Sequence, residues 1–439
     1  MLGNGRASWV VLHQRRQHIL ISNGEIKNAN DMGVLAGYQS GTSNIEVANM
    51  DIHNNGQASR ITSENGHCCY GIYAEGTDFS VHHSKIHDNP GYGIHINCSG
   101  CGSSIARVRI YGNKIYGNGG SESTQFGTLC EGSDCRIFLN EVYGNLAGLQ
   151  LLGCTNCLIY ENSIYNNNKT AAGYAGIQIT EASSNGTIIR NNILRSNGSN
   201  GIEDYGTNTI KDHNMCDSAA TGCGVTGNPL FIDTTAGSED LALQAGSPAI
   251  DAGISAISGI VTVGFNGSAP DIGAFETMTF LACSITGNTI TVTLNMIPGQ
   301  SPLSGISTAG STVTIDGIVR TPLSNAVAVG NNGFSMTYPG ATPISTVTWA
   351  YAQGTLADSA NIGGKNQRLN TITAQPCTVS GGVGGGGMSV YYVGQGSGDS
   401  DSNSCDSAKT DADGYRKRNF TGANGGSLAS AWPSELFGG

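Results

Sequence analysis

A short pattern of apolar and polar positions recurs six times between residues 44 and 200. In each copy an apolar residue is followed five positions later by Ile or Val, and three positions further on by Asn or a substitute. The copies read VANMDIHNN, VHHSKIHDN, IYGNKIYGN, IFLNEVYGN, IYENSIYNN and IIRNNILRSN. A repeat that returns every 22–34 residues is typical of a solenoid, in which each coil stacks on the one before it.

The repeated positions define rows that run along the predicted solenoid. Asn tolerates a left-handed backbone, and its amide can bond the same amide one coil away, so we predict structural Asn ladders. The apolar rows are Ile52, Ile86, Ile115, Val142, Ile164 and Ile193, and, five residues earlier, Val47, Val81, Ile110, Ile137, Ile159 and Ile188. The Asn rows are Asn55, Asn89, Asn118, Asn145 and Asn167, broken by Ser196 in the sixth copy, and Asn113, Asn140, Asn162 and Asn191.

Each coil also contains a second short strand that begins at Gly, as in GIYAE at 71, GIHIN at 93 and GLQLL at 148. Short strands rich in β-branched residues, separated by Gly/Asn turns, disfavour helices. The pattern predicts three parallel sheets around one apolar core, with a first coil in residues 9–43 that has no cap. Alternation along the Gly-led strands directs these side chains inward: Ile72, Ile94, Leu149, Ile177 and Ile202.

Composition narrows the classes of protein that the chain can belong to. The net charge of −11 provides no basic stripe for the phosphates of a nucleic acid. No run of about 18 apolar residues is present, so we expect no membrane span. The N-terminal MLGNGRASWVVLHQRRQ does not resemble a signal peptide, so a secreted protein would start upstream of Met1.

Thirteen cysteines favour an oxidising, extracellular compartment. The alternative is a metal site, because CSGC and CTNC have zinc-like spacing and stacking would bring them close to the cysteines of a neighbouring coil. Cys68 and Cys69 are adjacent, and Cys405 is left over. The expected disulfide pairs are Cys98/Cys101, Cys130/Cys135, Cys154/Cys157, Cys216/Cys223 and Cys283/Cys377.

Residues 9–215 resemble the right-handed parallel β-helix proteins of the pectate-lyase-like superfamily. Three blocks, NPLFID at 228–233, LALQAGSPAIDAG at 241–253 and DIGAFE at 271–276, resemble a C-terminal anchor-type segment of secreted bacterial β-helix proteins. We interpret them as a cap on the last coil. The resemblance therefore implies an all-β chain whose first domain, residues 1–276, is a capped β-helix.

The remainder of the chain has a different character. Residues 277–380 contain alternating strands typical of an immunoglobulin-like sandwich, tied by Cys283 and Cys377. Residues 381–439 are a Gly-rich linker and a tail whose MSVYYV resembles the opening strand of a β-helix. Either the chain is a slice of a tandem protein, or the tail caps its own first coil, or it caps the next molecule.

Candidate chemistry lies on the outward positions of the Gly-led strands. Hydrolysis of a glycosidic bond needs two carboxyl groups, and Glu75 and Glu131, two coils apart, would be separated by about 9.6 Å. Glu203 and Asp204 are adjacent in a strand, so one of the two faces inward, where a carboxylate needs a partner or a metal. The catalytic candidates are Glu75, Glu131, Glu203 and His95; the sugar-binding candidates are Tyr73, Asn97, Gln150 and Gln178. The alternative is that a solvated sheet face is polar in any case.

A second outward face contains Arg109 and Arg136 on adjacent coils. A uronate carboxylate would bridge them, and lyase chemistry requires such neutralisation, by Arg or by Ca²⁺, before a base removes the neighbouring proton. The alternative is that each Arg pairs with a local acid, Asp134 or Glu131. The outward row His53, His87, Tyr116, Tyr143 and Tyr165 is interpreted as a stabilising aromatic stack.

The resemblance does not supply a reaction. The NTD, DD and GHG motifs of polygalacturonase-like members and the WIDH-type signature of calcium pectate lyases are missing; the matching places read CYGIY, NGIED and GYGIH. We expect a secreted bacterial protein, extracellular or at the cell surface, that binds or acts on a polysaccharide as a lyase or glycoside hydrolase. The alternative is a structural protein, an adhesin or a filament subunit that self-associates through its tail.

Overall fold

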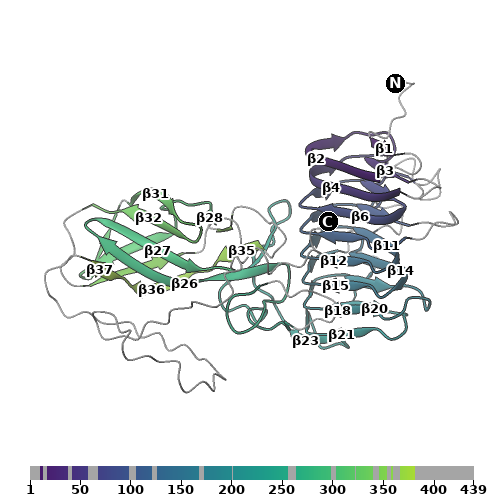
Figure 1. The fold of residues 1–439 in the computed structure, drawn as a ribbon. Helices are drawn as coiled ribbons and strands as arrows, with labels where there is room; N and C mark the ends of the chain where they lie inside the picture. The colour runs from purple at the N-terminus through teal and green to yellow at the C-terminus, as the bar shows by residue number, and fades with distance from the viewer. Residues whose placement is uncertain are drawn as a thin grey trace, which may run out of the picture.

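The computed structural model shows an all-β chain, with no helix in the part that it describes (Figure 1). The described residues are 10–12, 17–37, 42–57, 68–97, 105–120, 126–167, 173–199, 201–255, 264–297, 303–321, 323–339, 346–352, 357–358 and 366–380. In these residues no helix is long and apolar enough to cross a membrane.

The N-terminal half is a parallel solenoid with three faces. The glycine-led face contains β1 (Val10–Leu12), β3 (Val34–Ala36), β5 (Ile72–Ala74), β8 (Ile94–Ile96), β11 (Thr128–Ser133), β14 (Leu149–Thr155), β17 (Ile177–Ile179) and β20 (Ile202–Asp204), hydrogen-bonded in that order. The arginine face contains β6 (Gly76–His82), β9 (Arg109–Tyr111), β12 (Arg136–Phe138), β15 (Leu158–Tyr160), β18 (Ile188–Arg190) and β21 (Ile210–Asp212). The histidine face contains β7 (Lys85–His87), β10 (Lys114–Tyr116), β13 (Glu141–Tyr143), β16 (Ser163–Tyr165), β19 (Ile193–Arg195), β22 (Asn214–Cys216) and β23 (Cys223–Thr226).

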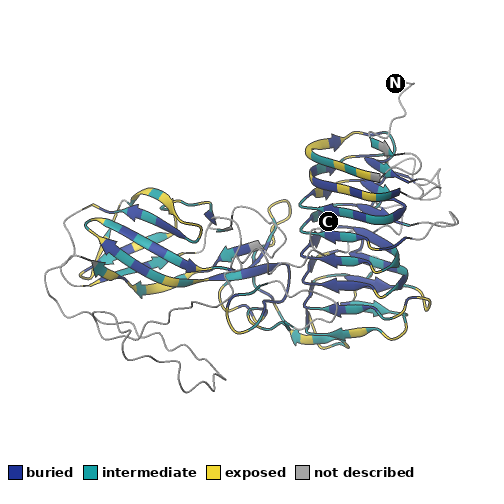
Figure 2. Cartoon of the chain, viewed as in Figure 1, coloured by how far each residue is buried: buried dark blue, intermediate teal, exposed yellow. Residues whose placement is uncertain are grey.

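The long strands β2 (Gln17–Lys27) and β4 (Thr42–His53) run across both the arginine and the histidine faces and join them into one sheet. The predicted three-sided coil is therefore present, but two of its sides form a continuous sheet. The inward rows fill a single core, in which side chains such as Ile86, Ile110 and Ile164 are completely buried (Figure 2). The inward positions predicted for Ile72, Ile94, Leu149 and Ile177 are confirmed by their complete burial.

Two unbroken hydrogen-bonded ladders line the turns. The side-chain oxygen of each member accepts a hydrogen bond from the backbone N–H of the member one coil before it. Where that preceding member is Asn, its side-chain amide donates to the same oxygen. The first ladder is Asn55, Asn89, Asn118, Asn145, Asn167 and Asn197. The second is Ser84, Asn113, Asn140, Asn162, Asn192 and Asn214.

The sequence alignment of the sixth repeat is therefore wrong by one residue. Leu194, not Ile193, pairs with the inward Ile164, and Ile189, not Ile188, pairs with Ile159. The ladder continues at Asn197, so Ser196 does not break it. The physical reason is that Ile193 faces outward, where it packs in a separate apolar cluster.

Glycine begins the strands of the glycine-led face because neighbouring coils approach closely there. A Cβ on Gly148 would lie 2.1 Å from the carbonyl oxygen of Gly176, and a Cβ on Gly176 would lie 2.7 Å from Nδ2 of Asn197. The glycine row thus lies directly against the first Asn ladder, and any side chain would separate the coils.

The segment that the sequence suggests as an end cap packs along the side of the solenoid. It contains β24 (Phe231–Asp233) and β25 (Asp240–Leu243), and its apolar residues cluster with Tyr143, Ile193 and Met215 of the histidine face. The backbone N–H of Ala274 donates to Ser163 Oγ at 3.1 Å. The outward Ile193 therefore serves as a docking position for this segment.

The C-terminal strands form two further sheets, which lie beside the solenoid in Figure 1. The first contains β26 (Phe275–Thr286), β27 (Thr289–Asn295), β28 (Leu303–Ser304), β31 (Ser324–Val329), β32 (Gly333–Thr337), β34 (Ala357–Asp358), β35 (Asn366–Leu369) and β37 (Thr378–Ser380). The second contains β29 (Ser311–Ile315), β30 (Ile318–Arg320), β33 (Val347–Tyr351) and β36 (Ile372–Pro376). They share a core around the fully buried Trp349. Because β26 runs across residue 276, the proposed domain boundary stays a prediction.

The cysteines divide into two groups. Disulfides join Cys68 to Cys69, Cys216 to Cys223 and Cys283 to Cys377, and the last two are pairs expected from the sequence. The expected pairs Cys130/Cys135 and Cys154/Cys157 are not formed, because these four residues are free thiols inside the core. Cys98, Cys101 and Cys405 lie outside the described residues.

Candidate functional site

The register of the glycine-led face aligns its outward side chains in one row. Parallel pairing places Tyr73 beside His95, and the row continues through the following coils. The aligned members are Tyr73, His95, Leu129, Gln150, Gln178 and Glu203. Adjacent members are one strand spacing apart, so the row is about 24 Å long.

Aromatic rings surround His95 at one end of this row. The imidazole stacks on Tyr92 with 4.4 Å between ring centroids, and Tyr70 and Tyr73 approach it edge-on at 4.7 and 5.2 Å. His95 is 8% exposed and Tyr70 only 1%. Burial raises the pKa of Tyr92 to about 12, and the nearby Tyr174 adds to the effect, so its phenol keeps its proton at neutral pH.

Glu75 lies beneath this cluster and not on the open surface. The Tyr73 hydroxyl donates to Glu75 Oε1 at 2.7 Å, and the glutamate is 4% exposed. Alternation along the strand predicts an outward Glu75, but the Tyr73 side chain lies over it. Glu131 is half-buried and pairs in register with Leu152 of the next coil. Glu75 and Glu131 therefore do not form a symmetric, solvent-facing carboxyl pair.

The other end of the row is acidic. Glu203 accepts from Gln178 Nε2 at 2.9 Å and from the Tyr205 hydroxyl at 2.8 Å. Its neighbour Asp204 has the inward partner expected of it, since Lys211 Nζ lies 2.8 Å from Asp204 Oδ2. Gln150 Nε2 donates to Thr180 Oγ1 at 3.4 Å, and Asn97 is half-buried after β8. These side chains form a polar strip with hydrogen-bonding groups of both kinds.

The two arginines predicted to bind a uronate lie on a different face. Arg109 and Arg136 are register partners on β9 and β12, so the structure brings them together. This face also presents a column of rings from β6, β9, β12 and β15, in which His82, Tyr111, Phe138 and Tyr160 stack at 4.7, 4.9 and 4.9 Å. The arginines are consequently separate from Tyr73, His95 and Glu203, and the sequence candidates do not converge on one site.

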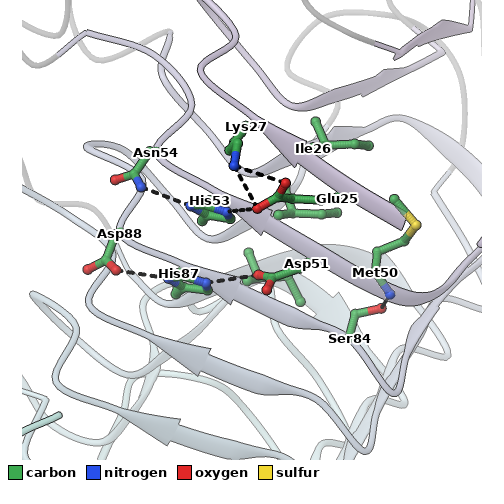
Figure 3. A network of polar contacts seen from close by, with 12 residues as sticks. Glu25, Ile26, Lys27, Met50, Asp51, His53, Asn54, Ser84, His87 and Asp88 are labelled. Carbon is green, nitrogen blue, oxygen red and sulfur yellow. Dashed lines mark hydrogen bonds and ion pairs between the residues drawn. The ribbon is translucent and has the colours of Figure 1, made fainter. Parts of the chain in front are cut away.

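The histidine face has a column of stacked rings with carboxylates beside it (Figure 3). His53 stacks on His87 at 4.7 Å, His87 on Tyr116 at 4.5 Å, and Tyr116 on Tyr143 at 5.1 Å, so the predicted stack is confirmed over these four residues. His87 lies between two carboxylates, with Asp51 at 2.9 Å from Nε2 and Asp88 at 2.8 Å from Nδ1. Both ring nitrogens can donate at once only in the protonated imidazole.

Two groups of side chains in the described part of the chain have metal-ligand chemistry: Asp51, His53 and His87, and Cys130, Cys135 and Cys154. The first group fits a metal poorly. A metal binds in the plane of each imidazole, and the planes of His53 and His87 are stacked with only 4° between them. Both nitrogens therefore cannot direct a lone pair at one ion.

Comparison with known proteins supports the fold. Residues 65–216 match the family model described as a right-handed β-helix region, and this segment is a parallel β-helix in the structure. No curated protein matches the chain. The chain thus contains a parallel β-helix and an additional unit of two packed β-sheets.

Several solved structures are similar in outline. Pectate lyase Pel9A matches with a TM-score of 0.40 and 18% identity over 58% of this chain and 65% of that one. The mannuronan C-5 epimerase AlgE4 A-module of Azotobacter vinelandii matches with a TM-score of 0.30 and 17% identity over 49% and 59%. Tailspike protein 2 of bacteriophage CBA120, its enzymatically active domain, matches with a TM-score of 0.31 and 13% identity over 82% and 51%. The chain spans less than two thirds of each of these proteins.

The sequence reasoning missed a column of aromatic residues directly before the glycines. Tyr70, Tyr92 and Phe126 precede Gly71, Gly93 and Gly127 in three successive coils. Their rings form a continuous contact, with Tyr92 5.4 Å from Tyr70 and 6.3 Å from Phe126. The repeated aromatic–Gly pair was the available signal.

Proposed function

We propose that the glycine-led face binds a polysaccharide along its outward row. The observation that supports this most directly is the alignment of Tyr73, His95, Gln150, Gln178 and Glu203 on successive coils. Amide and carboxylate groups match sugar hydroxyls, and the exposed parts of the aromatic cluster offer a surface for the apolar side of a sugar ring.

If the protein is an enzyme, the cluster around Tyr73 is the reactive end of this face. Its hydroxyl is hydrogen-bonded to the buried Glu75 and its ring contacts His95, so a proton on the phenol can pass to a carboxylate or reach an imidazole nearby. This arrangement suits proton abstraction or donation next to a bound sugar. Glu131, two coils further on, and Glu203, at the opposite end of the row, act as binding groups.

The test combines binding with product analysis. The full chain is incubated with a panel of uronate-containing and neutral polysaccharides, and unsaturated products are detected by ultraviolet absorbance and reducing ends by a colorimetric assay. We expect Gln150→Ala and Gln178→Ala to weaken binding, and Tyr73→Phe to abolish turnover while binding remains. The control is Lys27→Ala on the histidine face. Unchanged binding after both Gln substitutions would contradict the proposal.

A second candidate is a structural subunit, and the first coils favour it. Strand β1 pairs only with β3 and β2 only with β4, so in the described residues each leaves one edge for a further strand. We propose as the alternative that another strand, such as the segment 388–393, is added at this edge. Electron microscopy of the purified chain distinguishes the two, because ordered polymers without activity would favour the structural role.

We also propose an extracellular or cell-surface location and an immunoglobulin-like topology for residues 277–380. The three disulfides support the first proposal. The two packed sheets, one of them mixed and the other antiparallel, and the disulfide between Cys283 and Cys377 support the second. Such a unit would serve as a spacer or as an additional sugar-binding module.

A further inference from the structure

Two neighbouring coils place four thiols inside the solenoid. Cys130, Cys135, Cys154 and Cys157 are at most 1% exposed, and none is in a disulfide. Cys130 takes the place of an aliphatic side chain, because it pairs with Ile96 on one side and Leu151 on the other. Four sulfurs therefore gather at one level of a core that otherwise consists mostly of Ile, Leu and Val.

The sulfurs are close enough to share one ion. Those of Cys130, Cys135 and Cys154 lie within 4.8 Å of one another, and the Cys157 thiol interacts with those of Cys135 and Cys154. Four zinc–sulfur bonds of about 2.3 Å in a tetrahedron place the sulfurs about 3.8 Å apart. Cys157 does not belong to the group whose sulfurs all lie within 4.8 Å, so the side chains must rotate toward one another to complete the tetrahedron.

The four cysteines are not joined by disulfides. Cys135 and Cys157 directly precede Arg136 and Leu158, which are register partners, so the two cysteines are adjacent on parallel strands. Their backbone spacing of about 4.8 Å lies within the Cα–Cα range of disulfides, so a disulfide is the alternative that the first test below must exclude. The other described cysteines, six in all, are joined in pairs, so these four are the exception.

Buried hydroxyl groups on both sides of the cluster provide an independent observation. Thr187 directly precedes Ile188, the register partner of Leu158, and therefore follows Cys157 in the next coil. Its side chain is completely buried, and its Oγ1 has no hydrogen-bond partner among the described residues. The same holds for Thr128, two residues before Cys130. A thiolate sulfur would accept these hydrogen bonds, whereas an aliphatic core leaves them unmade.

We propose that Cys130, Cys135, Cys154 and Cys157 bind one zinc ion as a tetrathiolate within the β-helix core. Each thiol releases its proton to solvent as its Zn–S bond forms, so the loaded site has a net charge of −2. The ion would hold β11 to β14, the strands that carry Glu131 and Gln150.

The first test uses the full chain produced with zinc in the medium and purified without chelators. We expect one zinc ion per chain by elemental analysis. Replacement by Co²⁺ should give the intense sulfur-to-metal charge-transfer and visible bands of a tetrahedral thiolate site. Metal-free protein whose intact mass is lower by two hydrogens for each additional disulfide would overturn the proposal. Metal-free protein in which thiol labelling after denaturation and peptide mapping find Cys130, Cys135, Cys154 and Cys157 unbonded would overturn it as well.

The second test uses paired variants. Cys154→Ala combined with Cys157→Thr, which copies Thr187 one coil on, should remove the metal. The matched control, Cys216→Ala with Cys223→Ala, removes two cysteines elsewhere and should retain it. Thr187→Val should keep the ion but weaken its affinity about tenfold or more, because it removes a hydrogen bond to a ligand. Full metal content in the Cys154/Cys157 variant would refute the assignment, and the Co²⁺ spectrum of the unmodified chain gives an answer even if that variant fails to fold.

Discussion

Replacing Asn140 by Ala tests whether the inner ladder stabilises the solenoid. Asn140 is completely buried, and its side-chain oxygen accepts from the backbone N–H of Asn113 at 3.0 Å. Its Nδ2 donates to the carbonyl oxygen of Ile110 at 2.8 Å and to Asn162 Oδ1 at 2.9 Å. Alanine removes all of these interactions at once.

The expected loss follows from the groups left behind. The Asn113 N–H becomes a buried donor without an acceptor, which costs about 1–3 kcal/mol, and the Nδ2 bonds to Ile110 and Asn162 contribute about 0.5–1.5 kcal/mol each. Two further bonds share atoms with these and are not added separately: Asn113 Nδ2 donates to the same Asn140 oxygen, and Asn140 Nδ2 also donates to the Phe138 carbonyl. The sum is a loss of about 2–6 kcal/mol in the free energy of unfolding, large for one substitution.

The assay is thermal unfolding together with hydrogen exchange of the peptide that contains Asn113. We expect a lower melting temperature and faster exchange at that N–H. Asn140→Ser is the control, because Ser84 occupies the same ladder and its Oγ accepts from Met50 N at 3.0 Å. Serine should therefore recover part of the loss. A cost below about 1 kcal/mol for the alanine variant would refute the reasoning, because it would mean that the N–H finds another acceptor.

Three further predictions concern stability. Leu194→Ala should lower the free energy of unfolding by about 2–5 kcal/mol in a chemical unfolding experiment, because Leu194 faces the core. A smaller loss than that of Ile188→Ala would contradict the one-residue correction of the register. Gly148→Ala should lower the melting temperature, by a cost of about 1–3 kcal/mol, since its Cβ would meet the Gly176 carbonyl oxygen; an unchanged value would show that the coils can separate there. Hydrogen bonds from Arg107 hold the pKa of Asp78 below its usual range. The charged carboxylate therefore stabilises the fold at pH values above its pKa in the unfolded chain. This stabilisation is lost as the pH falls through its pKa in the folded chain. Asp78→Asn should therefore lower the melting temperature at neutral pH, and the difference from the unmodified chain should vanish once the pH falls below the folded pKa; a constant difference would exclude the ion pair as its cause.

Much of the solenoid is predictable from the sequence because its period repeats with little variation. The sixth copy was misaligned because IIRNNILRSN has two adjacent apolar residues at each inward position, and only the hydrogen bonds of Asn192 and Asn197 determine which one faces the core. The candidate site was less predictable. Alternation gives the side of the sheet, but not that Tyr73 lies over Glu75. The position of Arg109 and Arg136 on a second outward face, in contrast, follows from the repeat and is confirmed by their register pairing.

The segment 228–275 makes the two ends of the solenoid mechanically unequal. It braces the outer side of β13, β16, β19 and β22, whereas the first coils are held mainly by the next coil along the axis. In a stacked repeat each coil depends on its neighbours, so unravelling starts where the fewest contacts must break. Under pulling force or protease attack, the chain should peel from β1 and β2 toward a resistant stem that begins near β13. That stem contains Gln150, Gln178 and Glu203, so the polar end of the glycine-led face would persist after the aromatic end has opened.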